Sequence, residues 1–531
     1  MVTLIQTTLF LFLLVIATQC APASTFEENA SVNPGLVMRL TKKTFDYVTD
    51  ITIGQANRNA RKTKIPNYAG KFLHIKFYLY NMKVSNFDVK SHSVTFLPKQ
   101  MMNYKFADIN LSITGVVKIK SAAFRDTAKF EIVASRMSSS VNVKLALDPA
   151  SGRPTAVVGD CHADVPRTRV IFYKKHSILN LLSNYLSKVI KRNIEKQICG
   201  EKTINEINTA LAKGLQKMPT SETFLYDFVF DYRMLKNPYI NSTFMDTDHK
   251  GEVFWLNNRK ECPLPVRPME PMPHCTTKAM VASQLSAYTL NTFAYVAYKN
   301  KYFDHTFDSK NVPKAGLLNT TCENYCIGKL IPELAKAYPN KKVSVLLEAT
   351  EMPQPNIIKG DFILDGTITL TIYLSTDSPT KPLVILPIKI HTNSTANISK
   401  NIVHYSVSVL KLKIGLVKKG LPIKIDVEQL QRTINFGINA FLMPKINNEG
   451  HKGFPVPPIS KHMKLMNSQF QFGLNSAIFM TDFKFDVNFE QTEDDEDWFS
   501  WLIRSIGSLG YYMMSSIANI SNFNMSVSTQ T

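Results

Sequence analysis

A short basic cluster is the first feature of the sequence that could carry out chemistry: Arg58, Arg61, Lys62 and Lys64. Lysine and arginine donate charge-assisted hydrogen bonds to phosphate oxygens, and arginine can do so in a bidentate geometry. Lys99 and Lys105, in the segment PKQMMNYK, add two further cations. Such a cluster predicts a surface that binds an anion, although a solvated helix end explains the same residues.

The charge of the whole chain supports an anionic partner. The 531 residues carry a formal net charge of +20, and residues 33–214 hold 30 Lys and Arg against 12 Asp and Glu. A surplus confined to one part of the chain suits nucleic acid, acidic glycan or anionic lipid head groups. We expect no nucleic acid, because other features of the chain predict secretion.

The cysteines indicate disulfides. Removal of a leader that contains Cys20 leaves six of the seven cysteines, an even number typical of an oxidising compartment. A bridge between Cys161 and Cys199 would close a loop of roughly 40 residues and stabilise the fold by about 3 to 4 kcal/mol. The other four cysteines of the mature chain allow three disulfide pairings, and a zinc site that includes His274 is the alternative. These four are Cys262, Cys275, Cys322 and Cys326.

Motifs for catalysis are missing from the sequence. It has no Gly-x-Ser-x-Gly elbow, no His-Glu-x-x-His and no glycine-rich phosphate loop, and its 21 glycines are scattered. We therefore expect a binding protein without enzymatic activity, cofactor or metal.

The elements that must position the basic cluster follow from hydrophobic periodicity. Residues 33–68 predict one long amphipathic helix, in which Val37, Leu40, Phe45, Val48 and Ile51 share a face. From residue 71 to 98 the period changes to two, as in strands with one buried face, and residues 109–119, 130–134 and 141–147 continue that pattern. Residues 171–199 predict a second amphipathic helix. Two helices on one antiparallel sheet make a complete module.

A second module follows a linker. Five prolines between Cys262 and Cys275 exclude a helix or central strand and predict an extended connector. Helices are then expected at 280–298, 331–337 and 427–442, with strands at 342–349, 362–373, 383–391, 403–414, 463–472 and 476–485. The order helix, strands, helix thus occurs twice.

The two ends of the chain have their own signals. Residues 1–23 have the apolar run and small residues of a secretory signal peptide, although a basic residue near the start is lacking. Residues 487–531 are first acidic and then amphipathic, and an interfacial helix, a docking helix and a disordered tail all fit them. Eight Asn-x-Ser/Thr sites also suggest a secreted glycoprotein: Asn29, Asn110, Asn241, Asn319, Asn393, Asn397, Asn519 and Asn524.

Several motifs, spread in order over residues 32–486, resemble one family. They are NPGLVMRLTKKTFDYV (33–48), KIPNY (64–68), the Cys161 and Cys199 pair, KGEVFW (250–255), MVASQLSAYTLNT (280–292), KLIPELAKAYPN (329–340) and GFPVPP (453–458). The chain is similar to the bactericidal/permeability-increasing and lipopolysaccharide-binding proteins, to which the cholesteryl ester and phospholipid transfer proteins are related.

The resemblance implies an α+β fold, a boomerang of two pseudo-symmetric barrels. Each barrel is a twisted antiparallel sheet with long helices, and a central β-sheet and the proline-rich linker join them. The expected divisions are a signal peptide (1–23), an N-terminal barrel (32–230), a central segment and linker (231–276), a C-terminal barrel (277–486) and a tail (487–531).

The resemblance also implies a function and its residues. The outer tip of the first barrel would bind lipopolysaccharide or anionic phospholipid, through the six cations named above. Apolar pockets would take up acyl chains, and Leu36, Leu40, Leu182, Leu186 and Val189 are candidates in the first pocket, although core packing also explains them.

The hairpin KIKSAAFR (118–125) is less densely charged than in relatives, which weakens the endotoxin hypothesis. We expect a secreted monomer in innate antibacterial defence that contacts bacterial or lipoprotein surfaces; the alternative is an extracellular carrier of phospholipid or neutral lipid.

Overall fold

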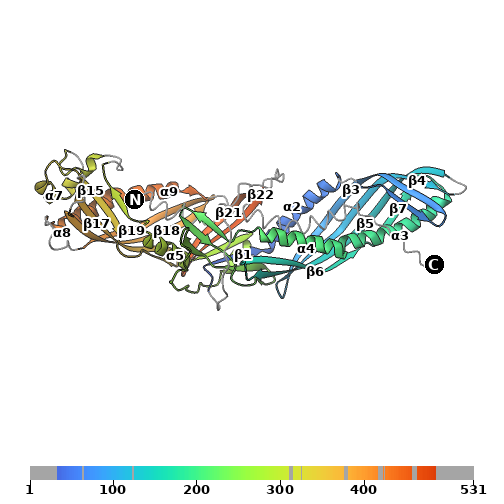
Figure 1. Ribbon diagram of the computed structural model, residues 1–531, viewed down its shortest axis with the longest axis horizontal. Coiled ribbons are helices and arrows are strands. Elements are labelled where there is room, and N and C mark those ends of the chain that lie inside the picture. The colour runs from blue at the N-terminus through green and yellow to red at the C-terminus, as the bar shows by residue number, and fades with distance from the viewer. Residues whose placement is uncertain are drawn as a thin grey trace.

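The structure is a computed structural model of an elongated molecule with two lobes joined end to end (Figure 1). It describes residues 33–62, 65–121, 125–225, 227–309, 315–323, 326–375, 381–415, 423, 425–456 and 463–485. The expected signal peptide, the tail and Lys64 lie outside the described residues. The expected α+β fold of two barrels around a central sheet is confirmed.

The central sheet takes strands from both halves of the chain. All of its neighbouring strands are antiparallel. Its order is β10 (Tyr239–Ile240), β11 (Phe244–His249), β1 (Leu36–Thr41), β13 (Val281–Ser286), β22 (Ser476–Phe485) and β21 (Met463–Gly473). The lobes are therefore joined by backbone hydrogen bonds between β1 and β13, in addition to the linker.

Three predicted helices begin with a strand instead. The first is β1 followed by α2 (Lys42–Ala60), and the second is β13 followed by α5 (Ala287–Lys299). The third, predicted at 171–199, begins with the last two residues of the strand Arg167–Phe172, and its helix is Ser177–Cys199. The sequence of β1 fits two periods. Val37 and Leu40 are apolar at the helical spacing of three, and Leu36, Met38 and Leu40 are apolar at the strand spacing of two. Pairing with strands on both sides satisfies the backbone of β1, which favours the extended form.

Glycine explains the start of β1. A Cβ on Gly35 would collide with the backbone oxygens of Lys250 and Gly251, and Gly251 has a positive φ of 62°. The two glycines let the chain before β1 pass directly against the chain after β11. The NPG sequence therefore marks a close backbone crossing, where a helix start was predicted.

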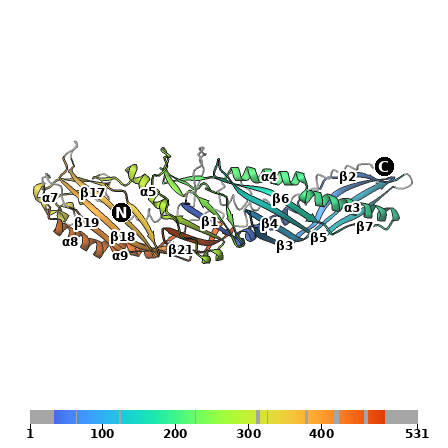
Figure 2. The same ribbon diagram turned by 90° about the horizontal axis from the view of Figure 1, so that it is seen from below.

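The first barrel is a long curled sheet closed by helices (Figures 1 and 2). Its strand order is β2-β3-β4-β5-β6, with β7 paired to β5. Irregular register between β3 and β4 adds twist and curvature. The bounds are β2 (Tyr68–Phe72), β3 (Ile75–Leu97), β4 (Met101–Lys120), β5 (Arg125–Asp148), β6 (Arg153–Asp164), β7 (Arg167–Phe172), α3 (Ser177–Cys199) and α4 (Glu201–Gln216).

The second barrel repeats this plan with shorter strands. Its strand order is β14-β15-β17-β18-β19-β20, with β16 paired to β17, and the predicted strands are confirmed within a few residues at most ends. The bounds are β14 (His305–Phe307), β15 (Val343–Ala349), β16 (Gln354–Ile358), β17 (Asp361–Leu374), β18 (Val384–Ser399), β19 (Ile402–Ile414) and β20 (Phe454–Pro455). The predicted helix 427–442 is α8 (Val427–Gly437), which continues through the π-helix η3 (Ile438–Leu442) into α9 (Met443–Lys452).

Shorter elements lie in two places, between the two barrels and in the second barrel after α5. A small sheet has the order β12 (Glu252–Trp255), β9 (Phe228–Asp231) and β8 (Ser221–Phe224). The proline-rich linker leads into η1 (His274–Lys278), and η2 (Ala315–Leu318), α6 (Ile327–Leu330) and α7 (Pro332–Ala337) follow α5.

The described part of the chain contains two disulfides. Cys161–Cys199 joins β6 to the end of α3, as expected, and Cys322–Cys326 closes a short loop before α6. Cys262 and Cys275 are free thiols, which corrects the expectation that they are disulfide-bonded, and burial raises the pKa of Cys262. Among the described residues, no group of three or more His, Cys, Asp or Glu could hold a metal ion.

Candidate functional site

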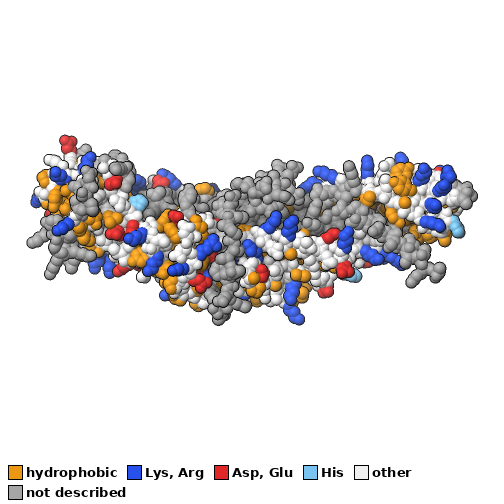
Figure 3. Space-filling model, in the orientation of Figure 1, with side chains coloured by type: hydrophobic (Ala, Val, Ile, Leu, Met, Phe, Trp, Pro, Cys, Tyr) orange, Lys and Arg blue, Asp and Glu red, His pale blue; other side chains and the backbone are white. Residues whose placement is uncertain are grey.

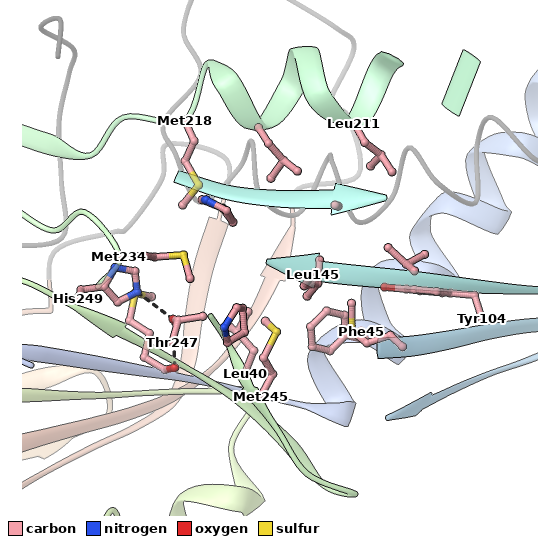
Figure 4. Close-up of a pocket in the computed structure, with 17 residues that line it drawn as sticks. Leu40, Phe45, Tyr104, Leu145, Leu211, Met218, Met234, Met245, Thr247 and His249 are labelled. Carbon is pink, nitrogen blue, oxygen red and sulfur yellow. Dashed lines mark hydrogen bonds between the residues drawn. The ribbon is translucent and has the colours of Figure 1, made fainter. Parts of the chain in front are cut away.

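An apolar pocket lies where the first barrel meets the central sheet (Figure 4). Its cavity volume is about 80 Å³, below the roughly 300–1,000 Å³ typical of small-molecule sites, and with the adjoining part open to solvent the unfilled space is about 790 Å³. Leu211 and Met218 cover it from the side of α4, opposite Leu40 and Met245 (Figure 4). The lining residues are Met38, Leu40, Phe45, Met102, Tyr104, Val143, Leu145, Pro154, Ala156, Leu211, Leu215, Met218, Met234, Pro238, Met245, Thr247 and His249.

The polar groups of this pocket satisfy one another. His249 Nδ1 lies 2.6 Å from the carbonyl oxygen of Tyr232 and therefore carries the proton. His249 Nε2 then accepts a hydrogen bond from the Thr247 hydroxyl at 2.8 Å. Burial lowers the pKa of His249 to about 4, so the ring is neutral at pH 7. Burial also raises the pKa of Tyr104, which keeps its phenol neutral.

The lining suits a flexible hydrocarbon chain. None of its side chains is charged at neutral pH, and five of its residues are methionines, whose unbranched side chains adapt to irregular shapes. Each methylene that leaves water for such a site contributes roughly 0.8 kcal/mol. The pocket therefore favours apolar chains and has no built-in charge for a head group.

The structure separates the five predicted pocket residues. Leu40 lines the pocket, whereas Leu36 packs with Phe224 and Phe228 in another cluster. Leu182 and Leu186 are buried in the core of the first barrel, and Val189 is half-buried on the same helix. The prediction missed α4, which supplies Leu211 and Leu215. Its signal was present as Ile204, Ile207, Leu211 and Leu215, at helical spacing after Gly200.

A row of four cations crosses the first barrel at the end remote from the central sheet. In the sheet register Lys71 is opposite Lys76, Lys76 is opposite Lys120, and Lys120 is opposite Arg125. All four are exposed, and among the described residues none of them forms an ion pair or side-chain hydrogen bond. We call this end, with the β2–β3 turn and residues 173–176 before α3, the distal end.

The electrostatics of the distal end favour an anion. Directly opposed side chains have Cβ atoms about 5 Å apart, and like charges in such pairs are destabilising. Nearby carboxylates are already engaged: Asp126 pairs with Lys174 at 2.6 Å, and Glu131 accepts a hydrogen bond from the Tyr173 hydroxyl. The hydrogen bond from Lys174 lowers the pKa of Asp126. Lys and Arg side chains gather at this end of the molecule (Figure 3).

The six predicted cations are not together at this end, which corrects their expected grouping. Lys99 lies in the β3–β4 turn, at the opposite end of both strands, and Lys105 is 15 residues from Lys120 in β4, or about 50 Å. Arg58, Arg61 and Lys62 are exposed at the end of α2, which Figure 1 places between the central sheet and the distal end.

The glycosylation candidates in the described residues vary in exposure. Asn397 is exposed in β18, and the others are half-buried, namely Asn110, Asn241, Asn319 and Asn393. No helix among the described residues is long and apolar enough to cross a membrane.

Two curled barrels around a shared sheet, with an apolar pocket at the junction and a cationic far end, define a class of two-barrel binding proteins. Models of the LBP / BPI / CETP family match the chain at residues 44–213 for the N-terminal domain and 225–485 for the C-terminal domain. The chain belongs to this family.

Individual relatives agree over most of the chain. Lipopolysaccharide-binding protein from Homo sapiens is 22% identical over 441 residues, which are 82% of this chain and 90% of that protein. Bactericidal permeability-increasing protein from Sebastes schlegelii is 21% identical over 465 residues, 86% and 96% of the two chains. A crystal structure of lipopolysaccharide binding protein superposes with a TM-score of 0.53 and 21% identity over 86% of this chain and all of that one, which supports the fold.

Proposed function

We propose that the protein is a secreted, monomeric lipid-binding protein of innate antibacterial defence. It binds the phosphates of lipopolysaccharide, or of anionic phospholipid, at the distal end of its first barrel. It holds acyl chains in the apolar pocket. No catalytic role is part of this proposal.

The cation row is the observation that carries the proposal. Four exposed cations from four adjacent strands lie side by side without acidic partners among the described residues. Phosphate groups would relieve their mutual repulsion through charge-assisted hydrogen bonds. One relative is named lipopolysaccharide-binding protein, which supports lipopolysaccharide as the ligand, and another is named bactericidal permeability-increasing protein, which supports an antibacterial role.

The pocket and the distal end serve different lipid molecules in this proposal. The 20 residues of β4 run from near the pocket to the cation row, about 65 Å at the rise of a strand. An acyl chain spans half of a hydrocarbon core of about 30 Å. One lipid therefore cannot reach both places, so the distal end contacts a lipid surface while the pocket holds a separate molecule.

The sequence-derived cations have a changed role in this proposal. Lys71, Lys76, Lys120 and Arg125 replace Lys99 and Lys105 as phosphate-binding residues, because the register places them together. Arg58, Arg61 and Lys62, partway along the barrel, add to its positive potential over a longer range.

A second candidate function is carriage of zwitterionic or neutral lipid through extracellular fluid. The absence of charged side chains from the pocket lining favours it, since such a pocket selects chains and not head groups.

The deciding experiment uses the purified full-length protein. Binding to lipopolysaccharide and to phosphatidylcholine vesicles is measured at two salt concentrations, and copurified lipids are identified by mass spectrometry. The proposal expects tighter, salt-dependent binding to lipopolysaccharide. Equal affinity for phosphatidylcholine would favour the carrier function, and a protein without lipid and without affinity for either would contradict both.

A further inference from the structure

The β2–β3 turn places a leucine at the apex of the distal end. Phe72 is paired with Ile75, so Leu73 and His74 form a two-residue hairpin turn. The Leu73 side chain is 66% exposed, and its backbone has a positive φ of 51°. Figure 2 shows β2 near the right-hand end of the molecule.

Leucine is a poor choice for this turn on structural grounds. A positive φ is strained for residues with a branched apolar side chain, and two-residue hairpins prefer glycine, asparagine or aspartate at such positions. Because the side chain is exposed to water, little hydrophobic stabilisation from burial offsets this strain. Neither packing nor turn geometry accounts for Leu73, whereas contact with an apolar phase would.

Neighbouring side chains extend the apolar apex. Phe72 stacks on Tyr185 of α3 with ring centroids 4.1 Å apart, so this helix lies against the β2–β3 hairpin. Leu181, one helical turn before Tyr185, is 56% exposed, and Tyr173, at the entry to α3, is 64% exposed. Exposed apolar side chains of this size grouped at one end are typical of interaction surfaces.

Cations border this apex. Lys71 and Lys76 are cross-strand partners, and they flank Leu73 on the two strands of its hairpin. The rest of the cation row follows on β4 and β5. Apolar side chains that project beyond a border of lysines match a lipid leaflet, whose anionic head groups lie outside its hydrocarbon.

We propose that Leu73 is a membrane-inserting residue of the distal end. It enters the hydrocarbon of an anionic lipid leaflet together with Leu181, while Lys71 and Lys76 remain at the level of the phosphates. The inference rests on the proposed function and adds a mode of contact to it. The barrel docks end-on, so the apolar pocket stays far from the leaflet during contact.

Substitution of Leu73 separates folding from docking. Leu73→Gly relieves the positive φ, so the variant should melt at the same or a higher temperature than the parent. Its affinity for phosphatidylglycerol vesicles should fall about tenfold, because one leucine side chain no longer leaves water. The salt dependence of binding should remain, because the cation row is intact.

Leu474→Gly is the matched control. Leu474 is 45% exposed in the two-residue turn between β21 and β22, which belongs to the central sheet. This change removes an equally large exposed side chain far from the cation row, and it should leave vesicle binding unchanged.

Leu73→Trp reports insertion directly. The emission of the introduced tryptophan should shift to shorter wavelength when phosphatidylglycerol vesicles are added. Lipids that are brominated on their acyl chains should quench this emission. If the parent binds these vesicles, while Leu73→Gly binds equally well and Leu73→Trp emission is unshifted, the inference is overturned and the proposed function stands. If the parent binds neither these vesicles nor lipopolysaccharide, the proposed function fails and the inference fails with it.

Discussion

Arg39 and Asp246, 207 residues apart in the sequence, are joined by two parallel hydrogen bonds across the central sheet. Arg39 Nε donates to Asp246 Oδ1 at 2.8 Å, and Nη2 donates to Oδ2 at 2.7 Å. Arg39 also donates to the Thr276 hydroxyl and stacks on the ring of Phe244, 3.6 Å from its centre. Burial raises the pKa of Asp246 even though Arg39 opposes the shift. The pair fixes the register of β1 on β11, from which α2 and the first barrel continue.

Replacing Asp246 by asparagine should destabilise the protein by about 3 to 5 kcal/mol, because the buried arginine loses its charge partner. Chemical denaturation measures the change. The control is Asp46→Asn, which breaks the exposed Lys42–Asp46 pair within α2 and should cost less than about 1 kcal/mol. Equal effects of the two substitutions would show that burial of the central pair is unimportant.

Filling the apolar pocket should reduce lipid uptake. Ala156→Phe on β6 projects a ring into the pocket, whereas Val157→Phe changes the next residue, whose side chain is 54% exposed. We expect several-fold less copurified lipid for Ala156→Phe and an unchanged amount for Val157→Phe. Thermal melts verify that both variants fold. If the Ala156→Phe protein folds and copurifies with as much lipid as the parent, the lipid binds at another site.

Neutralising the cation row should weaken binding to lipopolysaccharide. The double variant Lys76→Ala and Lys120→Ala loses two charges near the lipid surface, each worth about 1 kcal/mol, so affinity should fall roughly 30-fold. Lys99→Ala with Lys105→Ala removes the same charge at the other end of the strands. Its effect should be small, since charges separated by more than about 8 Å are screened at physiological ionic strength. If the Lys99 and Lys105 double variant lost more affinity for lipopolysaccharide than the Lys76 and Lys120 double variant, Lys99 and Lys105 would be phosphate-binding residues, as predicted from the sequence.

Acidification should destabilise the central region through His249. The pKa of this buried ring is about 4, below the ordinary value of 6.5, so between these values the unfolded chain binds more protons than the folded one. Stability is therefore complete above pH 6.5 and falls towards pH 4, by about 3 kcal/mol in total. Denaturation at several pH values measures the slope. His249→Gln should flatten it, and an unaltered slope in that variant would assign the effect to other groups.

The two disulfides should differ in their contributions. Cys161 and Cys199 are 38 residues apart, and by chain entropy their loss costs about 4 kcal/mol. Cys322 and Cys326 are 4 apart, and their loss costs about 2 kcal/mol. Paired alanine variants, compared by denaturation, measure both values. The reverse order would mean that strain or residual structure in the unfolded state outweighs loop entropy.

Local periodicity in the sequence was sufficient to predict most elements. Alternation in β3 and β4, and helical spacing in α3 and α8, depend only on which neighbours share a face, so these elements could be read from the chain, whereas β6 and α4 were missed. The prolines after Cys262 and the Cys161–Cys199 bridge likewise follow from local chemistry. The motifs from 33 to 458 were enough to suggest the family.

Tertiary structure decided where the functional residues meet. Leu36–Thr41 satisfies both periods, and only pairing with β11 and β13 makes it a strand. The cation row joins residues 71 to 125 through the three registers between four strands, two of which are irregular, and local pattern cannot fix such registers. Sequence therefore determined that the first half is cationic and built from amphipathic strands and helices. The long-range hydrogen bonds of the sheet determined which cations, and which leucine, stand at its end.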